Sequence, residues 1–62
     1  MLTIRLTSGG ELLKDADIAE QHGSVFMLYA REASGNLVKT DTYRAASIEW
    51  VRLEDGTVVR CT

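Results

Sequence analysis

An unbroken apolar run, Val-Phe-Met-Leu-Tyr-Ala at residues 25–30, constrains the fold of this chain more than any other feature. It lies between Gly23 and the turn-forming triplet Ser-Gly-Asn at residues 34–36. Successive side chains of a strand point to opposite faces, so a strand formed by this run is apolar on both. We therefore expect it to be covered on both sides, by the rest of the chain or by a partner.

The chain has little material with which to cover such a strand. A domain of 62 residues buries only about 60% of the surface that its unfolded form exposes. Cys61 is the only cysteine, so no disulfide can form within the chain. Cys61 and the single histidine, His22, cannot supply the four ligands of a structural zinc site. We predict one domain over residues 1–62, with no metal site and no cofactor, stabilised by tight packing or self-association.

The composition is that of a folded, non-membrane protein. Hydrophobic residues make up 45% of the chain, which is too high for a disordered sequence. No apolar run approaches the ~20 residues that span a bilayer, and the N-terminus lacks the pattern of a signal peptide. A lone thiol suits a reducing compartment, so we predict a cytoplasmic protein.

The net charge of −2 is unevenly distributed. Residues 11–22 carry four acidic side chains against one lysine, which gives this segment −3 and leaves +1 for the remainder. An acidic domain lacks the broad basic surface that non-specific nucleic-acid binding requires. No motif for a small-molecule substrate is evident. We therefore expect a protein partner or a second copy of the chain, with nucleic acid a weaker candidate.

Alternating and apolar segments predict several strands. The first is half-buried, with Leu2, Ile4 and Leu6 on one face. Turns that contain glycine follow it and separate most of the later strands, whereas residues 44–46, Arg-Ala-Ala, form a short connection. We predict strands at residues 2–7, 25–32, 37–43, 47–53 and 57–60. In the fourth of these, Ile48 and Trp50 are expected to share one face.

Residues 11–22 fit two structures. Ser8 and Glu11 have capping-box spacing and Gly23 suits the end of a helix. As a strand, the segment would place Ala16 and Ile18 on one side and Ala19 on the other. Asp and Ala are poor strand residues, but two glycines would fill the first turn of the helix.

The order of these signals resembles that of Sm-like small β-barrels, a subset of the SH3-like folds. A first strand ends at Gly9-Gly10, a second turn falls at His22-Gly23, and the apolar strand follows. Residues 43–51 look like the closing pair of strands of that family, joined by one tight turn. The resemblance favours a bent strand for residues 11–22 and implies a barrel able to assemble into rings.

The RNA-contacting signature of that family is not matched. Gln-His-Gly-Ser at residues 21–24 stands where an Asp-aromatic-Asn turn is expected, and Ala45-Ala46 replaces an Arg-Gly turn. We predict an all-β fold, a small antiparallel barrel of five to six strands. The alternative is an α+β fold with one helix at residues 11–22 against a sheet.

Three acidic residues, Asp15, Asp17 and Glu20, are candidates for a partner-binding face. The spacing of a calcium loop is absent, so these carboxylates form either a solvated surface or a docking site for a basic partner. The second alternative is typical of a phage- or mobile-element-type inhibitor that mimics nucleic-acid charge.

The aromatic residues also admit two interpretations. We expect Trp50 in the core, because so small a chain needs large apolar side chains inside. If Val51 and Leu53 turn inward instead, Trp50 becomes an interface anchor. Tyr29 and Tyr43 admit the same two interpretations, and Arg44 is the nearest cation. With Trp50, these residues could form a stacking and phosphate-binding surface for single-stranded nucleic acid.

No residue pattern indicates an enzyme. His22 and Ser24 lie two positions apart on a turn, without an oxyanion-hole motif, so they do not predict a nucleophile and its base. We predict a non-enzymatic protein-interaction module that self-associates through strand edges or an apolar face. The alternatives are an acidic inhibitor that docks through residues 11–22 and a single-stranded nucleic-acid-binding barrel.

Overall fold

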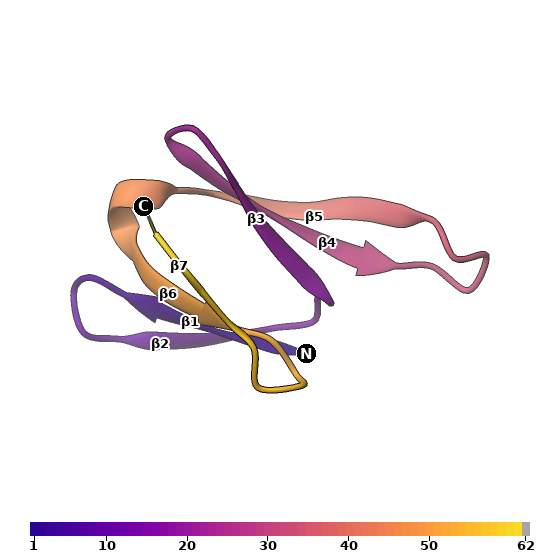
Figure 1. Cartoon of the computed structure of the whole chain (residues 1–62), viewed down its shortest axis with the longest axis horizontal. Helices are drawn as coiled ribbons and strands as arrows, with labels where there is room; N and C mark the ends of the chain where they lie inside the picture. The colour runs from indigo at the N-terminus through magenta and orange to yellow at the C-terminus, as the bar shows by residue number, and fades with distance from the viewer. Residues whose placement is uncertain (62) are drawn as a thin grey trace.

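The computed structural model describes residues 1–61, which form an all-β domain of two antiparallel sheets (Figure 1). The first sheet has the order β2-β1-β6-β7 and the second the order β3-β4-β5. The strands are β1 (Leu2–Leu6), β2 (Glu11–Lys14), β3 (Ile18–His22), β4 (Val25–Arg31), β5 (Leu37–Arg44), β6 (Ile48–Arg52) and β7 (Val58–Arg60). A short 3₁₀ helix, η1 (Ala45–Ser47), connects β5 to β6.

The chain passes between the sheets at two places. Residues 15–17 carry it from β2 in the first sheet to β3 in the second, and η1 returns it from β5 to β6. The crossing through η1 brings distant parts of the sequence together, because β6 pairs with β1 and Val51 lies opposite Ile4. The described residues form two separate hydrogen-bonded sheets rather than a closed barrel.

Residues 11–22 form two strands with a bend between them, so the helix alternative is wrong. At the bend, the Asp17 backbone N–H donates to the Tyr29 carbonyl at 2.8 Å, and the Asp17 carboxylate accepts from the Arg31 N–H at 2.7 Å. The bend also resets the alternation of side chains. Ala16 and Ala19 are both buried, whereas Ile18 is half-buried, because the strand period does not continue through residues 15–17.

The core lies between the two sheets and contains side chains from both. Leu2 and Ile4 point into it from β1, on one face as their spacing predicts, and Phe26 and Leu28 point into it from β4. No polar side chain of a described residue is buried. The buried set consists of Leu2, Ile4, Ala16, Ala19, Phe26, Leu28, Ala45, Ile48 and Val51.

The expectation that Trp50 lies in the core is wrong, and so is its expected pairing with Ile48 on one face. Opposite β1, Arg5 pairs with Trp50 but Leu6 pairs with Ile48, so Glu49 is an extra residue in β6. Such a bulge shifts the side-chain alternation by one position. Ile48 and Val51 therefore both point inward, while Trp50 is half-buried on the outer face.

Residues 1–61 form seven strands rather than five or six, because the bend divides the predicted strand at residues 11–22 into β2 and β3. The ends of the two sheets meet through side chains: Lys14 of β2 lies 3.8 Å from the Asp41 carboxylate and 5.8 Å from the Tyr43 ring centroid, both on β5. Hydrogen bonding to Tyr43, together with the charge of Asp41, raises the pKa of Lys14 above its ordinary value.

Among residues 1–61 the helical structure is limited to η1, and no helix has the length or apolarity to cross a bilayer.

Candidate functional site

Four apolar side chains form a continuous ridge on the outer face of the second sheet, on the side of β4 that faces away from the core. Val25, Met27 and Tyr29 project from β4 at alternate positions, and Ile18 of β3 lies directly opposite Tyr29. All four are half-buried. We call this set the β4 face. The apolar run at residues 25–30 is thus fully buried at Phe26 and Leu28 on one side and only half-buried on the other.

Charged and polar side chains border the β4 face on both sides. On β3, Glu20 lies opposite Met27 and His22 opposite Val25. The His22 Nε2 is 3.2 Å from the Glu20 Oε1. This border is therefore acidic, with a histidine that becomes cationic only when protonated.

The border on the β5 side is basic. Arg44 pairs with Val25, Thr42 with Met27 and Lys39 with Tyr29. All three border residues are exposed. The β4 face thus consists of an apolar centre with a carboxylate on one side and two cations on the other.

The hairpin between β4 and β5 extends beyond the core (Figure 1). Leu37 and Val38, at its end, are 46% and 43% exposed. The other edge of β5 has no strand partner in the described chain. A bulge interrupts this strand opposite Leu28, and the Thr40 hydroxyl donates to the Leu28 carbonyl at 3.4 Å. A bulge and a lysine are common features that protect an edge strand from pairing.

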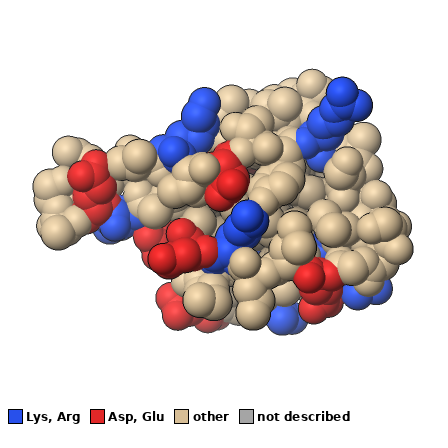
Figure 2. Space-filling view, turned by 180° about the vertical axis from the view of Figure 1, so that it is seen from behind, with Lys and Arg blue, Asp and Glu red and all other residues tan. Residues whose placement is uncertain are grey.

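The three acidic candidates are exposed, but they do not share one role. Asp15 lies at the bend, the Asp17 carboxylate is bound to the Arg31 N–H, and Glu20 lies on the border of the β4 face beside His22. Figure 2 shows acidic and basic side chains interspersed on one side of the molecule, without a broad area of either sign.

The structure does not bring the aromatic and basic candidates together. Tyr29 lies on the β4 face and Arg44 on its border. Tyr43 pairs with the buried Phe26 and contacts Lys14. Its side chain therefore lies on the face of the second sheet that is turned toward the core. Trp50 lies on the outer face of the first sheet. These four residues cannot form the single stacking surface considered from the sequence.

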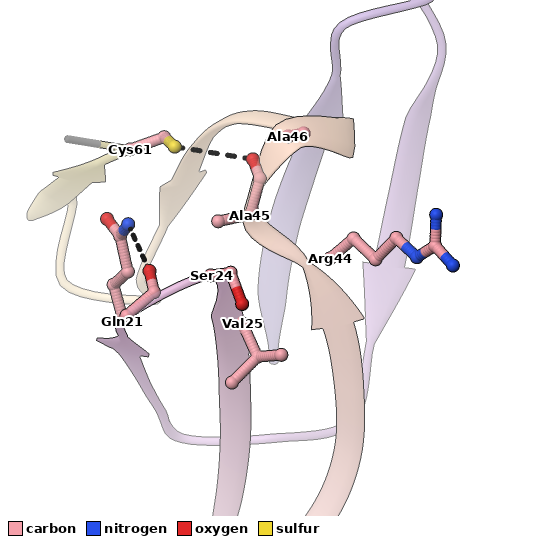
Figure 3. A pocket seen from close by; sticks show the side chains of 8 residues that line it. Gln21, Ser24, Val25, Arg44, Ala45, Ala46 and Cys61 are labelled. Carbon is pink, nitrogen blue, oxygen red and sulfur yellow. Dashed lines mark hydrogen bonds between the residues drawn. The ribbon is translucent and has the colours of Figure 1, made fainter.

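A cleft of about 570 Å³ opens beside η1 (Figure 3). It is lined by Gln21, Gly23, Ser24, Val25, Arg44, Ala45, Ala46 and Cys61. The Cys61 thiol donates to the Ala45 carbonyl at 3.3 Å. The Arg44 side chain extends away from Gln21 and Cys61, which lie on the other side of Ala45. The cleft is therefore lined mainly by small side chains and backbone.

The arrangement around the cleft does not make a nucleophilic site. The imidazole of His22 contacts Glu20 on the outer side of the sheet, and no hydrogen bond joins it to Ser24 in residues 1–61. The described part of the chain also contains no group of three or more His, Cys, Asp or Glu side chains placed to hold a metal ion.

Comparisons of this chain with protein-family models, with curated proteins and with solved structures found no match. Its function must therefore be argued from its own surfaces.

Sequence reasoning overlooked Arg52 and Arg60. Arg60 lies directly opposite Trp50 on β7, and the guanidinium carbon of Arg52 is 5.4 Å from the Trp50 ring centroid. The hairpin signal Glu-Asp-Gly at residues 54–56 could have identified them, because it fixes which residues of β6 and β7 are neighbours.

Proposed function

We propose that this chain is a non-enzymatic protein-interaction module that self-associates through the β4 face. The observation that carries the proposal is the half-covered apolar ridge of Ile18, Val25, Met27 and Tyr29, which is continuous across β3 and β4. Four neighbouring apolar side chains on one sheet face form a patch rather than isolated exposed residues. Covering this patch would stabilise a chain too small to cover it alone.

The opposite charges on the two borders of the β4 face favour a second copy of this chain as the partner. In a face-to-face dimer with its two-fold axis parallel to β4, β3 of one copy lies over β5 of the other. Glu20 then faces the row that contains Lys39 and Arg44, at the level of Thr42 and between the two cations. The same contact forms twice, as an isologous interface requires. Of the three acidic candidates, only Glu20 contributes to this surface.

The expected dimer is weak. Three strands spaced ~4.8 Å apart and about six residues long give a face of ~14 Å by ~20 Å. This is well below the ~800 Å² per partner of a standard interface, so a dissociation constant in the micromolar range or above is expected. The exposed Leu37 and Val38 on the hairpin could enlarge the contact.

We further propose that the two sheets, which no strand pairing among the described residues joins into a closed barrel, together make a small, open barrel of the Sm-like and SH3-like type. The pairing of β6 with β1 after the η1 turn supports this, as does the bend that carries one strand segment between sheets. The lone thiol of Cys61 supports a cytoplasmic location.

The experiment is native mass spectrometry and light scattering over a dilution series from about 1 µM to about 1 mM. We expect a monomer–dimer equilibrium that Met27→Lys abolishes, because the variant places a charge in the centre of the patch. Leu13→Lys is the matched control, since Leu13 is 70% exposed on the other sheet. A monomer throughout the range, or equal loss in both variants, would refute the proposal.

A further inference from the structure

Trp50 lies at the centre of a second surface, on the outer face of the first sheet. Arg5 of β1 and Arg60 of β7 lie directly opposite it on either side, and Arg52 is two residues further along β6 on the same face. Three guanidinium groups therefore surround one half-exposed indole. Tryptophan and arginine are also the residue types most enriched where surfaces bind tightly.

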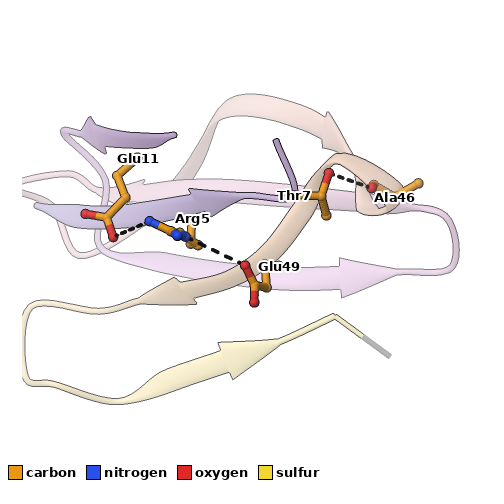
Figure 4. A network of polar contacts seen from close by, with 5 residues as sticks. All are labelled: Arg5, Thr7, Glu11, Ala46 and Glu49. Carbon is orange, nitrogen blue, oxygen red and sulfur yellow. Dashed lines mark hydrogen bonds and ion pairs between the residues drawn. The ribbon is translucent and has the colours of Figure 1, made fainter. Parts of the chain in front are cut away.

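The three arginines are not equivalent. Arg5 is held between two carboxylates, with Glu11 3.4 Å from its Nη1 and Glu49 3.7 Å from its Nε (Figure 4). Arg52 and Arg60 are exposed and make no ion pair or hydrogen bond from their side chains with any described residue. The two uncompensated charges thus lie on the β6–β7 side of Trp50.

We propose that Trp50, Arg52 and Arg60 bind a short segment of single-stranded nucleic acid. A base stacks on the indole and the phosphates on either side of it contact the two guanidinium groups. This inference goes beyond the proposed self-association, which uses the other sheet. It also replaces the aromatic set considered from the sequence, of which only Trp50 is retained.

The spacing of the two cations fits this ligand. Arg60 is one strand away from Trp50 and Arg52 is two residues along, so their Cα atoms are ~8 Å apart on the diagonal. Successive phosphates of an extended single strand have a similar separation. An acidic peptide could pair with the arginines, but its carboxylates would make no use of the aromatic plane between them.

Arg52 has two positions in this scheme. In the unbound protein its guanidinium lies over the indole. Because the side chain is exposed and flexible, it can move to a phosphate while the base takes its place on the ring, where stacking is the stronger interaction. The net charge of −2 opposes long-range attraction of a polyanion, so binding is expected only at low salt.

Trp50 is the only tryptophan, so its fluorescence reports on the site directly. The test is a titration with an oligothymidylate of about ten nucleotides, at several salt concentrations. We expect saturable quenching and a slope of log K against log salt of about −1.4, since two phosphate contacts on a single strand each contribute about −0.7. Polyglutamate and inorganic phosphate are the ligand controls, and neither should quench comparably.

Arg60→Gln should weaken binding several-fold and reduce the slope to about −0.7, because one phosphate contact is lost. Arg31→Gln is the matched control, since it removes the same charge from the hairpin of the other sheet. Trp50→Leu, followed by the anisotropy of a labelled oligonucleotide, should weaken binding about tenfold.

Three results would overturn the inference: no quenching with oligonucleotide up to about 1 mM, equal quenching by polyglutamate, or equal loss in the Arg60 and Arg31 variants. Met27→Lys separates this inference from the proposed self-association, because it should leave oligonucleotide binding unchanged. If Met27→Lys abolished oligonucleotide binding, the site would require the dimer and the inference as stated would be wrong.

Discussion

The two sheets share one core but differ on their outer faces. The second sheet presents the apolar β4 face, with its charges at the borders, whereas the first presents one indole among arginines. On the first sheet Val51 points inward, and the outside carries arginines together with the exposed Leu13 and Val58. On the second, β4 is apolar on both sides. The difference is one of arrangement: the apolar side chains of the second sheet form one continuous ridge, whereas Thr3 and Arg52 separate Leu13 from Val58 on the first sheet.

The largest test compares the two faces of β4 itself. Leu28→Ala should lower the free energy of unfolding by about 2–5 kcal/mol, because it leaves a cavity at a fully buried position. Met27→Ala should cost only about 1 kcal/mol in dilute solution, where its side of the strand is half-open. Urea denaturation followed by circular dichroism measures both. Equal losses in monomeric protein would mean that the β4 face is already covered.

The same comparison applies to β6. Val51→Ala should lower the free energy of unfolding by about 2 kcal/mol, since Val51 is fully buried. Trp50→Leu should cost less than about 1 kcal/mol, because Trp50 lies on the outer surface. Thermal melts monitored in the far ultraviolet report both. A larger loss for Trp50→Leu than for Val51→Ala would place the indole in the core after all.

The pairs Leu28 and Met27 on β4, and Val51 and Trp50 on β6, also show how far a sequence of this kind predicts its fold. Alternation in β1 and the apolar run in β4 were sufficient to predict both strands and to place Leu2 and Ile4 on one face. The assumption that alternate residues share one face failed where the backbone departs from a regular strand. The bulge at Glu49 and the bend at residues 15–17 each shift the alternation, and neither has a glycine or proline to mark it.

The candidate surfaces were harder to predict than the strands. The apolar run indicated a need for cover on both sides, but not which side would remain open. Asp17 was grouped with Asp15 and Glu20 because they are near in sequence, whereas its carboxylate binds the Arg31 N–H. Arg60 became a candidate only once strand pairing placed it beside Trp50. Such neighbours depend on register, which for β6 and β7 follows from the Glu-Asp-Gly turn at residues 54–56 and not from the composition of either strand.

A charge exchange would sharpen the assignment of the β4 face. Glu20→Arg should weaken the dimer about three- to fivefold, because it places like charges across the proposed interface. Adding Arg44→Glu to the same chain should restore part of the affinity, since a carboxylate then replaces one of the two cations opposite residue 20 while Lys39 remains. Sedimentation equilibrium measures the three dissociation constants. Failure of the double variant to recover would argue against β3 facing β5 of the other copy.

The smallest effect concerns pH and affects the first sheet alone. The Asp55 carboxylate accepts a hydrogen bond from the Thr57 N–H at 2.9 Å in the β6–β7 turn, and this bond lowers the pKa of Asp55 from its ordinary value of 3.8. The stabilisation is therefore present above that value and is lost as the pH falls through the lower pKa of the folded state.

The Thr57 amide resonance, followed by NMR on acidification, should consequently titrate with a midpoint below 3.8. Asp55→Asn should remove this transition, whereas Asp15→Asn, at the exposed bend between the sheets, should leave it in place. Because the turn sets the position of Arg60 opposite Trp50, the indole fluorescence should change over the same range. If amide resonances of the β4 face shifted with the same midpoint as Thr57, the outer faces of the two sheets would be coupled. They would then not act as independent surfaces.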